Sequence, residues 1–454
     1  MSDIEKTTAS EGLDPAFASG GKLELPFEGV VGRFPESVAS LPDKKMLLLF
    51  SASSLEKSLP KVARLLEDGT LDSTFGKQGI VEIPSRAGAV FSARHLRLLD
   101  NGGWLVTGTV EHSNDSVDLA VVRQLADGQM DTSFGPEKDG MVTVNVYDLI
   151  ESRSHPDANF LTRRHDDKNV EKSSAEAGGF GMLGVGLLDG KIVLSSTVFF
   201  AFDYLRGLVL RLDADGSLDK TFNEKGFVLV ELPDVTHRWN YASGLAVQPD
   251  GKVLVCGDFS RATSDESPDA YVIRYDQHGK VDASYGDNKN GLVTITDSSH
   301  WLDLVSMVLK PDGGLLAAGA ASRESRRDGL IVALNSSGSF NLVFNNGKPL
   351  FSRFTEHGVA WERCVWQTDG KLVVSGQGGA AFLDEKSSVV TARYNLNGSL
   401  DTAFVGKGWA VFNHENGVDI FRGCTVTDDS RIVVCAYTAF GTPPYPGYVL
   451  RYLA

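Results

Sequence analysis

The chain has 454 residues, with 59 acidic against 44 basic side chains and a formal net charge of −15 at pH 7. An acidic surface repels phosphate backbones and anionic lipid headgroups, so we expect neither nucleic acid nor a membrane surface as a partner. Hydrophobic residues make up 42% and charged residues 23%, a composition typical of a folded globular protein.

The N-terminus and the cysteines favour a cytoplasmic protein. Residues 1–12 are polar and acidic and lack the apolar core of a signal peptide, and the chain has no apolar run long enough to span a membrane. We expect residues 1–10 to be flexible. The four cysteines show no CxxC spacing and lie in apolar runs, which predicts reduced, buried thiols and neither a disulfide nor a metal site. They are Cys256, Cys364, Cys424 and Cys435. No cofactor is predicted.

From residue 36 onward, one half-motif recurs in which alternating apolar residues flank an Asp-Gly or Asn-Gly pair. Clear copies read LRLLDNGGWLVTG (96–108), LAVQPDGKVLVCG (245–257), MVLKPDGGLLAAG (307–319) and CVWQTDGKLVVSG (364–376). Alternation around such a turn predicts a two-stranded antiparallel hairpin, for example residues 244–248 paired with 252–257.

A second half-motif follows each hairpin. An arginine is followed eight residues later by an aspartate, and the aspartate three residues later by an aromatic residue. The copies are Arg64, Asp72 and Phe75; Arg123, Asp131 and Phe134; Arg211, Asp219 and Phe222; Arg274, Asp282 and Tyr285; Arg393, Asp401 and Phe404. A third strand such as 270–275 precedes this turn and a short fourth strand such as 292–296 follows it. Four strands in each repeat of this length predict a propeller blade.

Six units lie near 36–84, 91–147, 180–233, 242–296, 304–354 and 359–413, and a seventh begins at 421 but ends after its third strand. Residues 11–27 contain the missing half, because Asp14 and Phe17 stand to Arg451 as the other aspartates and aromatics stand to their arginines. The sequence therefore predicts an all-β protein, a seven-bladed β-propeller of four-stranded antiparallel blades. Residues 11–454 form one domain whose last blade is closed by the N-terminal strand.

The fifth unit departs from the pattern in an informative way. It has Ala333 in place of the arginine and Asn341 in place of the aspartate. Because a buried carboxylate without its cation is costly, this joint loss predicts that the two side chains pair in the other blades. Independent drift in a degenerate copy is the alternative explanation.

The two half-motifs in fixed order, QPDGK-[VL]-[VL]-V-x-G and R-[YL]-x-x-x-G-x-[LV]-D-x-x-F-G, resemble the delta-60 repeat family of bacterial β-propellers. The resemblance covers residues 11–454 and implies a propeller fold. It implies no reaction, since fold does not fix function, and we assign the repeat residues to architecture.

Residues 148–178 have no counterpart elsewhere and are predicted to be an insertion between blades two and three. Loops of this length are usually functional or disordered. A lid or a partner-docking segment is one hypothesis, and a passive insertion is the other. The candidate binding residues of this segment are His155, Arg163, Arg164 and His165.

The connections between blades differ from unit to unit, and binding residues concentrate on variable loops carried by a rigid scaffold. Histidine, tryptophan and acidic residues gather there, which predicts a polar binding site at the channel mouth. The candidates are His237, Trp239, His300, Trp301, Asp303, His357, Trp361, Glu362 and His414. Residues that only seal the blade junctions are the alternative, and the spacing does not favour a metal site.

No GxSxG elbow, P-loop, HExxH or dinucleotide fingerprint occurs, so no catalytic residue is predicted. The sequence favours a non-enzymatic binding or interaction scaffold, a monomer that binds a small molecule, a glycan or a protein. A hydrolase or lyase with its site at the channel mouth and a carbohydrate-binding propeller remain as alternatives.

Overall fold

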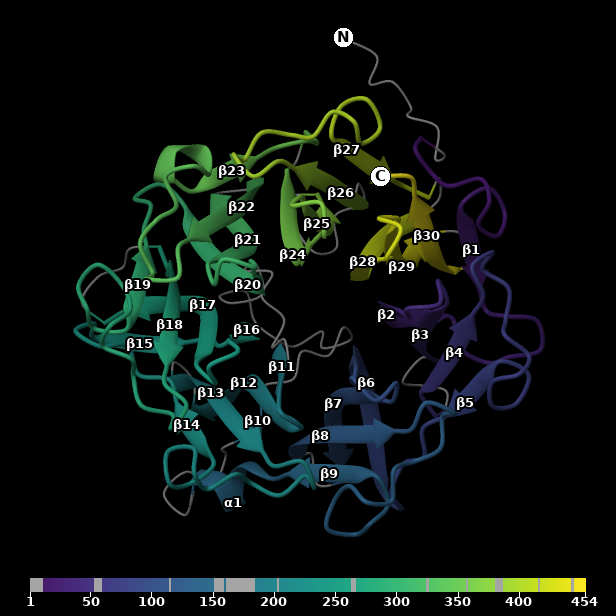
Figure 1. Cartoon of the computed structure of the whole chain (residues 1–454), viewed down its shortest axis with the longest axis horizontal. Coiled ribbons are helices and arrows are strands. Elements are labelled where there is room, and N and C mark those ends of the chain that lie inside the picture. The colour runs from purple at the N-terminus through teal and green to yellow at the C-terminus, as the bar shows by residue number, and fades with distance from the viewer. Residues whose placement is uncertain are drawn as a thin grey trace. The chain divides into compact units, whose positions relative to one another are not determined.

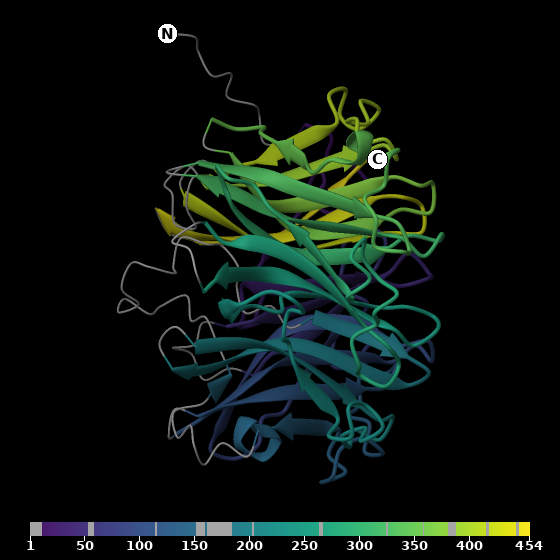
Figure 2. The ribbon, with the colours of Figure 1, turned by 90° about the vertical axis from the view of Figure 1, so that its left-hand side faces the viewer.

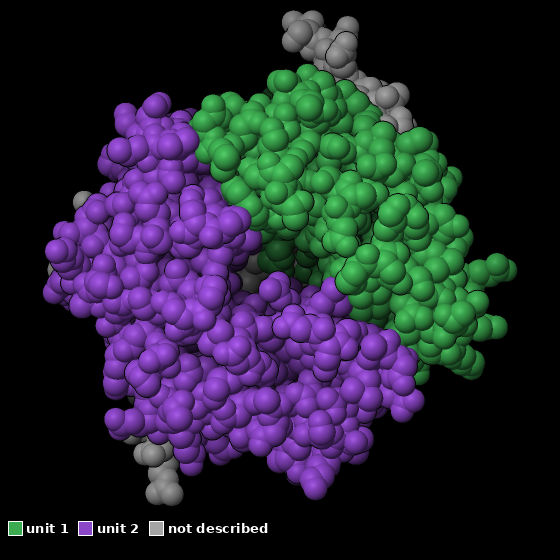
Figure 3. Space-filling view, viewed as in Figure 1, with its two compact units in different colours: residues 1–83, 325–327, 352–454 green, residues 84–324, 328–351 purple. Residues whose placement is uncertain are grey.

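The protein is a seven-bladed β-propeller, as the repeat predicts. The computed structural model describes residues 11–52, 59–113, 116–150, 159–160, 184–201, 204–262, 267–323, 326–356, 358–379, 387–414, 417–441 and 445–454. Their strands form seven antiparallel sheets (Figure 1). The chain divides into two compact units (Figure 3). Unit 1 comprises residues 1–83, 325–327 and 352–454, and unit 2 comprises residues 84–324 and 328–351.

Unit 1 contains three blades. The first has the order β2 (Phe34–Ser40), β3 (Met46–Ser51), β4 (Lys61–Leu65) and β5 (Ile80–Glu82). The sixth has the order β24 (Val359–Trp366), β25 (Leu372–Gly378), β26 (Ser388–Tyr394) and β27 (Trp409–Phe412). The seventh has the order β28 (Gly417–Val426), β29 (Ile432–Gly441), β30 (Gly447–Tyr452) and β1 (Lys22–Leu25).

Unit 2 contains the second to fifth blades. The second blade consists of β6 (Ala89–Leu98), β7 (Trp104–His112), β8 (Val117–Gln124) and β9 (Met141–Val144), followed by the short helix α1 (Val146–Ile150). The fourth consists of β15 (His237–Asn240), β16 (Gly244–Val247), β17 (Val253–Arg261), β18 (Asp269–Tyr275) and β19 (Leu292–Ile295). The fifth consists of β20 (Trp301–Leu309), β21 (Leu315–Arg323), β22 (Arg326–Leu334), the 3-10 turn η2 (Asn345–Gly347) and β23 (Leu350–Ser352).

The third blade contains a short extra strand. It consists of β10 (Asn159–Phe160), β11 (Gly184–Leu188), β12 (Lys191–Ala201), β13 (Tyr204–Leu212) and β14 (Phe227–Leu229). Both β10 and β11 pair with β12, just as β15 and β16 both pair with β17 in the fourth blade. Of the predicted insertion, residues 148–150 therefore belong to α1 and residues 159–160 to this sheet. Residues 151–158 and 161–178 lie outside the described residues, as does the N-terminal segment 1–10.

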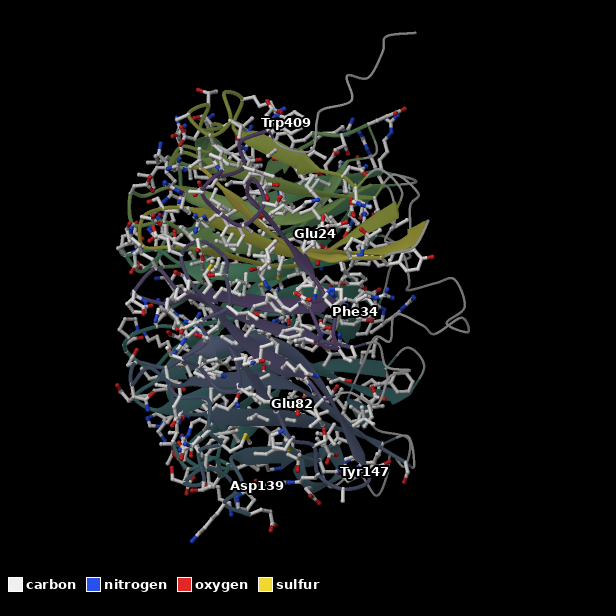
Figure 4. All side chains as sticks on the ribbon, turned by 90° about the vertical axis from the view of Figure 1, so that its right-hand side faces the viewer. Glu24, Phe34, Glu82, Asp139, Tyr147 and Trp409 are labelled. Atoms are coloured by element: carbon white, nitrogen blue, oxygen red, sulfur yellow. The ribbon has the colours of Figure 1, made fainter. Side chains whose placement is uncertain are left out.

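The strand register confirms the predicted blade. In the fourth blade Gly244 pairs with Cys256 and Val247 with Val253, which is the hairpin expected from the Asp-Gly turn. The strands of a sheet run between two ends of that sheet, as the blades nearest the viewer in Figure 2 show. The hairpin turns and the Asp-x-x-aromatic segments lie at one end, here called the turn end. The second-to-third-strand connections and the links between blades lie at the other, the connection end. In the second blade Asp139 precedes β9 and Tyr147 follows it, toward opposite ends (Figure 4).

The N-terminal strand closes the last blade, as predicted. Strand β1 pairs with β30 along its whole length, from Lys22 opposite Leu450 to Leu25 opposite Gly447. Phe17 is fully buried in the core beneath this strand. The seventh sheet is therefore four-stranded only because residues from the two ends of the chain pair with each other.

The predicted ion pair forms in six blades. The shortest arginine nitrogen to aspartate oxygen distances recorded are 2.8 Å for Arg64–Asp72, 2.7 Å for Arg123–Asp131, 2.6 Å for Arg211–Asp219, 2.9 Å for Arg274–Asp282, 3.4 Å for Arg393–Asp401 and 3.0 Å for Arg451–Asp14. Burial alone would raise the pKa of Asp219, but bonds from Lys191, Thr221 and Arg211 hold it well below the usual range. The aspartate is therefore a fully charged member of the folded protein.

The same arginine also connects neighbouring blades. The guanidinium of Arg211 lies 4.7 Å from the ring centroid of Phe222 and donates at 2.7 Å to the carbonyl oxygen of Gln277 in the next blade. Arg274 repeats this arrangement with Tyr285 and the carbonyl of Ser336. These two motifs therefore join their own turns to the following blade through a stacked ring and a hydrogen bond.

The hairpin supplies a second cation to most of these aspartates. Five of them face a basic side chain from the first half-motif of their own blade: Lys45, Lys191, Lys252, Lys371 and Arg431. In the fifth blade the corresponding residue is Gly314, so this blade lacks all three charged members of the motif. A neutral amide network replaces them, in which Asn341 Nδ2 donates to Asn335 Oδ1 at 2.9 Å.

The four cysteines are free thiols, and three are buried: Cys256, Cys364 and Cys435. Among the described residues, no helix is long and apolar enough to cross a membrane.

We expect Asp219→Ala to lower the free energy of unfolding by about 3 kcal/mol, because it leaves the buried Arg211 guanidinium uncompensated. Arg211→Ala should cost less, since Lys191 remains 2.7 Å from Asp219. The double substitution should cost far less than the sum. Urea unfolding of the four proteins measures the coupling, and additive losses would contradict the pairing. Asn341→Ala in the uncharged fifth blade is the control, with an expected loss of about 1 kcal/mol.

Deletion of residues 1–27 should abolish cooperative unfolding or cause oligomerisation, because the deletion exposes the edge of β30 and removes Asp14 from Arg451. Calorimetry and sedimentation measure the two outcomes. A monomeric deletion variant with an unchanged melting temperature would show that the closing strand is dispensable.

Candidate functional site

The first strand of five blades carries a β-bulge at a corresponding place. In each of these blades one residue of the first strand is skipped in the backbone pairing with the second strand. It directly follows the residue that pairs with the last position of the hairpin motif. The skipped residues are Glu36, Arg94, Val305, Glu362 and Arg422. The strands approach closely here, since a β-carbon on Gly376 would lie 2.0 Å from the carbonyl oxygen of Ala360. Bulges re-aim side chains and are frequent beside functional sites.

Three charged bulge residues lie on the first strands of unit 1. Arg422 Nε of β28 is 3.6 Å from Glu36 Oε2 of β2. The Ser51 hydroxyl donates to Glu36 Oε1 at 3.1 Å, and an Arg422 amino group lies 3.4 Å from the Tyr437 hydroxyl. Together with Glu362 of β24, these residues place a guanidinium among carboxylates on three first strands. We call Glu36, Glu362 and Arg422 the inner-strand cluster.

Arg422 of the inner-strand cluster holds its charge despite little contact with solvent. The side chains of Arg422 and Glu36 are 13% and 8% exposed. Burial opposes the charge on Arg422, but Tyr437 and the two glutamates outweigh it and raise the pKa of its guanidinium. The neighbouring Arg363 differs, because burial lowers its pKa below the ordinary value despite the field of Glu362. A polar group entering beside this cluster would find both hydrogen-bond donors and acceptors.

The charged side chains of the cluster are compatible with two roles, protection of the edge strand and binding of a ligand. The first strand of each sheet is an edge strand, and charged side chains and bulges on edges prevent unwanted strand pairing. That role needs charge but no particular arrangement, whereas recognition needs alternating signs at fixed positions.

Asp419 on β28 is a buried carboxyl close to the connection end. It accepts hydrogen bonds from the backbone N–H of His414 at 2.6 Å and from the Thr438 hydroxyl at 2.9 Å. Burial raises the pKa of Asp419 to about 7, although these two bonds act in the opposite direction. The sequence does not distinguish this residue, because an aspartate within an alternating strand is expected to face solvent.

The predicted site residues of the fourth blade lie on β15 and have local partners. His237 Nδ1 is 3.1 Å from the carbonyl oxygen of Val235, and its Nε2 is 2.8 Å from Asn240 Nδ2. Burial lowers the pKa of this imidazole, which favours the neutral form. Trp239 is half-buried and meets Tyr241 edge-to-face. His237 Nε2 also lies 3.5 Å from Glu231 Oε2 at the end of the third blade, so this imidazole has partners on both sides of the blade junction.

The predicted residues of the fifth blade lie at the start of β20. His300 Nδ1 is 2.8 Å from Asp297 Oδ1, and its ring stacks on Phe351. Trp301 is half-buried and follows it directly. Asp303 is buried and accepts the backbone N–H of Ala320 at 2.6 Å.

The remaining candidates belong to unit 1 or lie outside the described residues. Trp361 is fully buried, packs near Phe354 and presents no ring face to a ligand. Glu362 is the one predicted residue that occupies a bulge. His414 is half-buried, with its ring 5.6 Å from that of Tyr448. Four insertion residues and one connection residue lie outside the described residues: His155, Arg163, Arg164, His165 and His357.

The structure adds a histidine that the sequence analysis did not name. His112 Nε2 is 2.9 Å from Asp118 Oδ2, and Asn145 Nδ2 donates to the other oxygen of Asp118 at 2.7 Å. Asp118 is buried, while the His112 side chain is 36% exposed. A buried carboxylate thus orients an accessible imidazole at the connection end of the second blade. The polar start of the third strand, VDLAVV, was the available signal.

Within the described ranges, no group of three or more His, Cys, Asp or Glu side chains could hold a metal ion.

Five segments match the family model described as "Domain of unknown function (DUF5122) beta-propeller": residues 42–75, 100–134, 188–222, 248–285 and 367–404. Each match ends at the aromatic residue of the second half-motif. The matches support a β-propeller repeat family. No protein with a curated description matches the sequence.

Similar solved structures differ widely in their described activities. They include a protein of unknown function from Dyadobacter fermentans (12% identical, TM-score 0.41, covering 95% of this chain and 100% of that chain). A glucose dehydrogenase is 12% identical, with a TM-score of 0.36 over 76% of this chain and 92% of that one. A puromycin hydrolase is 15% identical, with a TM-score of 0.45 over 95% of this chain and 53% of that one. At these identities and TM-scores the likeness transfers no activity to this chain.

We expect Asp419 to make stability depend on pH. Its pKa is higher in the folded state, about 7 against 3.8 for the ordinary group, so the folded protein binds the proton more tightly. The free energy of unfolding should therefore fall as pH rises from about 4 to about 7, by up to about 1.4 kcal/mol for each pH unit. Asp419→Asn should remove this slope and become more stable than the wild type at pH 8.

Chemical denaturation at pH 5, 6, 7 and 8 measures the difference between the wild type and Asp419→Asn. Asp43→Asn, which removes an exposed carboxylate, corrects for the change in net charge. An Asp419→Asn difference from the wild type that does not vary with pH would contradict the assignment.

Proposed function

We propose that the protein is a non-enzymatic binding scaffold that recognises a small polar ligand through the inner-strand cluster and the connection ends around it. The observation that carries this proposal is the charged bulge. The β-bulge recurs in the first strands, while the side chain at the bulge differs. It is a glutamate in the first and sixth blades, Glu36 and Glu362, and an arginine in the seventh, Arg422. A constant frame with variable side chains is the arrangement expected of a binding surface.

The distribution of ion pairs supports the same assignment. At the turn end, the repeat commits its arginines, lysines and aspartates to one another. At the connection end, the residue five positions before the repeat arginine differs by blade. Asp118 pairs with His112, Arg206 with Glu231, and Asp269 with Arg261. The chemistry that can distinguish one ligand from another is therefore concentrated at the connection ends.

The inner-strand cluster favours a ligand with both donors and acceptors. Glu36 and Glu362 accept hydrogen bonds or attract a cation, and Arg422 binds a carboxylate or phosphate oxygen. A zwitterionic or polyhydroxylated metabolite meets these requirements. A tryptophan-based glycan platform is less supported, because Trp104 and Trp361 are buried and the other four tryptophans are only partly exposed.

A hydrolase or lyase is the second candidate, and the pair His112 and Asp118 favours it. A general base needs an accessible imidazole whose other nitrogen is held by an acceptor, and His112 meets this requirement. Turnover of a compound by the wild type that is lost in His112→Ala would favour the enzyme over the scaffold.

The proposal also includes four properties that were predicted from the sequence. They are membership of the delta-60 repeat family, a cytoplasmic location, a monomeric state, and no binding to nucleic acid or membranes. The net charge of −15 supports the last of these.

A thermal-shift screen tests the scaffold. Amino acids, sugars, nucleotides and di- and tricarboxylates are added to the wild type at millimolar concentration. A ligand at one hundred times its Kd stabilises the folded state by about 2.7 kcal/mol, so a binding compound should raise the melting temperature by several degrees. The shift should be lost in Glu362→Gln and kept in Glu82→Gln, which changes an exposed glutamate. A shift that survives in Glu362→Gln would place the site elsewhere, and no shift with any compound would count against a small polar ligand.

A further inference from the structure

The turn end of the fifth blade exposes two apolar side chains. Among the large hydrophobic residues that the structure describes, Leu342 and Val343 are the most exposed, at 78% and 68%. They lie between Asn341 and the buried aromatic Phe344 of the second half-motif. Adjacent, strongly exposed apolar side chains mark an interaction site more often than scattered ones do.

Four other blades use the second of these two positions for architecture. The second residue after the aspartate carries a hydroxyl that donates to the aspartate, as Thr221 donates to Asp219 at 2.6 Å, while Arg211 donates to that hydroxyl at 3.0 Å. Thr74, Ser133 and Ser284 are bonded in the same way. The fifth blade has neither the arginine nor the aspartate, so Val343, which occupies this position, has no such task.

An open groove of about 200 Å³ adjoins this turn. Gly338 and Phe340 of the fifth blade line it together with Asp287, Asn288, Asn290 and residues 292–294 of the fourth blade and residues 233–235. Asp287 is exposed at the rim, and Asp234 accepts a hydrogen bond from Asn290 at 3.0 Å. The groove thus combines an aromatic ring with two carboxylates, and its Phe340 lies two residues before Leu342 in the chain.

We propose that this turn and groove form a docking site for an extended segment of a partner protein, in which a basic side chain is flanked by apolar ones. The apolar side chains pack on Leu342 and Val343, and the basic side chain enters the groove toward Asp287 and Asp234. Burying the exposed pair supplies the hydrophobic contribution to binding, and the carboxylates select the charge.

Charge complementarity selects this occupant over a second copy of the chain. The protein carries a net charge of −15, and the rim of the groove is itself acidic. Two such surfaces repel each other, whereas a basic segment is attracted. The site lies in unit 2 and shares no residue with the inner-strand cluster, so the two proposals succeed or fail independently.

The test uses a displayed library of random twelve-residue peptides. The library is selected on the wild type and counter-selected on the double variant Leu342→Ser, Val343→Thr, which restores the polar residues of other blades. The recovered peptides should carry a lysine or arginine next to apolar residues. By fluorescence anisotropy they should bind at least tenfold more weakly to the double variant and to Asp287→Asn. Leu396→Ser, which changes a 56%-exposed leucine in the sixth blade, should bind as the wild type does.

Because these side chains are exposed, the variants should keep the melting temperature of the wild type, and any binding defect is then separate from unfolding. The proposal is overturned if no peptide distinguishes the wild type from the double variant, or if the peptides that do so are acidic or uncharged. It is also overturned if sedimentation reveals self-association that the double variant abolishes, because the occupant would then be a second copy.

Discussion

The buried aspartate of the second half-motif, with the cations around it, is the interaction on which the rest of the structure depends. In the third blade Asp219 holds both Arg211 and Lys191, so it joins the third strand to the first hairpin. The remaining N–H groups of Arg211 reach the Thr221 hydroxyl and the carbonyl of Gln277 in the next blade. A charge removed from water is tolerable only with such complete pairing, and in four of the six charged blades a hydroxyl two residues after the aspartate contributes to it.

This commitment determines where recognition can take place. At the turn end the charged side chains satisfy one another, and a ligand would have to compete with them. At the first strands a bulge leaves the side chain outside the ladder register, so its identity can change without disturbing the blade. Glu362 and Arg422 occupy that position in consecutive blades with opposite charges. The constant ion pairs and the variable bulges are thus two consequences of one repeat, the first giving stability and the second allowing specificity.

Most of the fold could be predicted from the sequence, because residues 11–27 carry the aspartate and aromatic residue, Asp14 and Phe17, that the unit containing Arg451 lacks, and this reveals the closing strand. The site was harder to predict. A bulge changes the pairing of residues and not their spacing, so nothing in the sequence distinguishes Arg422 from its neighbours. Trp361 was predicted as a binding residue because a tryptophan stands near the start of a blade. The pleat of β24 instead turns its ring toward Phe354 and into the core. His112 and Asp118 meet because they lie at adjoining ends of the paired strands β7 and β8.

The fifth blade shows what happens when the central interaction is absent. Without an arginine and an aspartate there is no hydroxyl to position, and the neutral pair Asn335 and Asn341 maintains the same backbone turn. The turn survives because its backbone hydrogen bonds, such as that from the Asn341 N–H to the carbonyl of Ala333, do not depend on charge. The ion pair is therefore needed for the strength of the joint and not for its shape. A blade that keeps the shape without the charges is free to place apolar side chains outward, as it does at Leu342 and Val343.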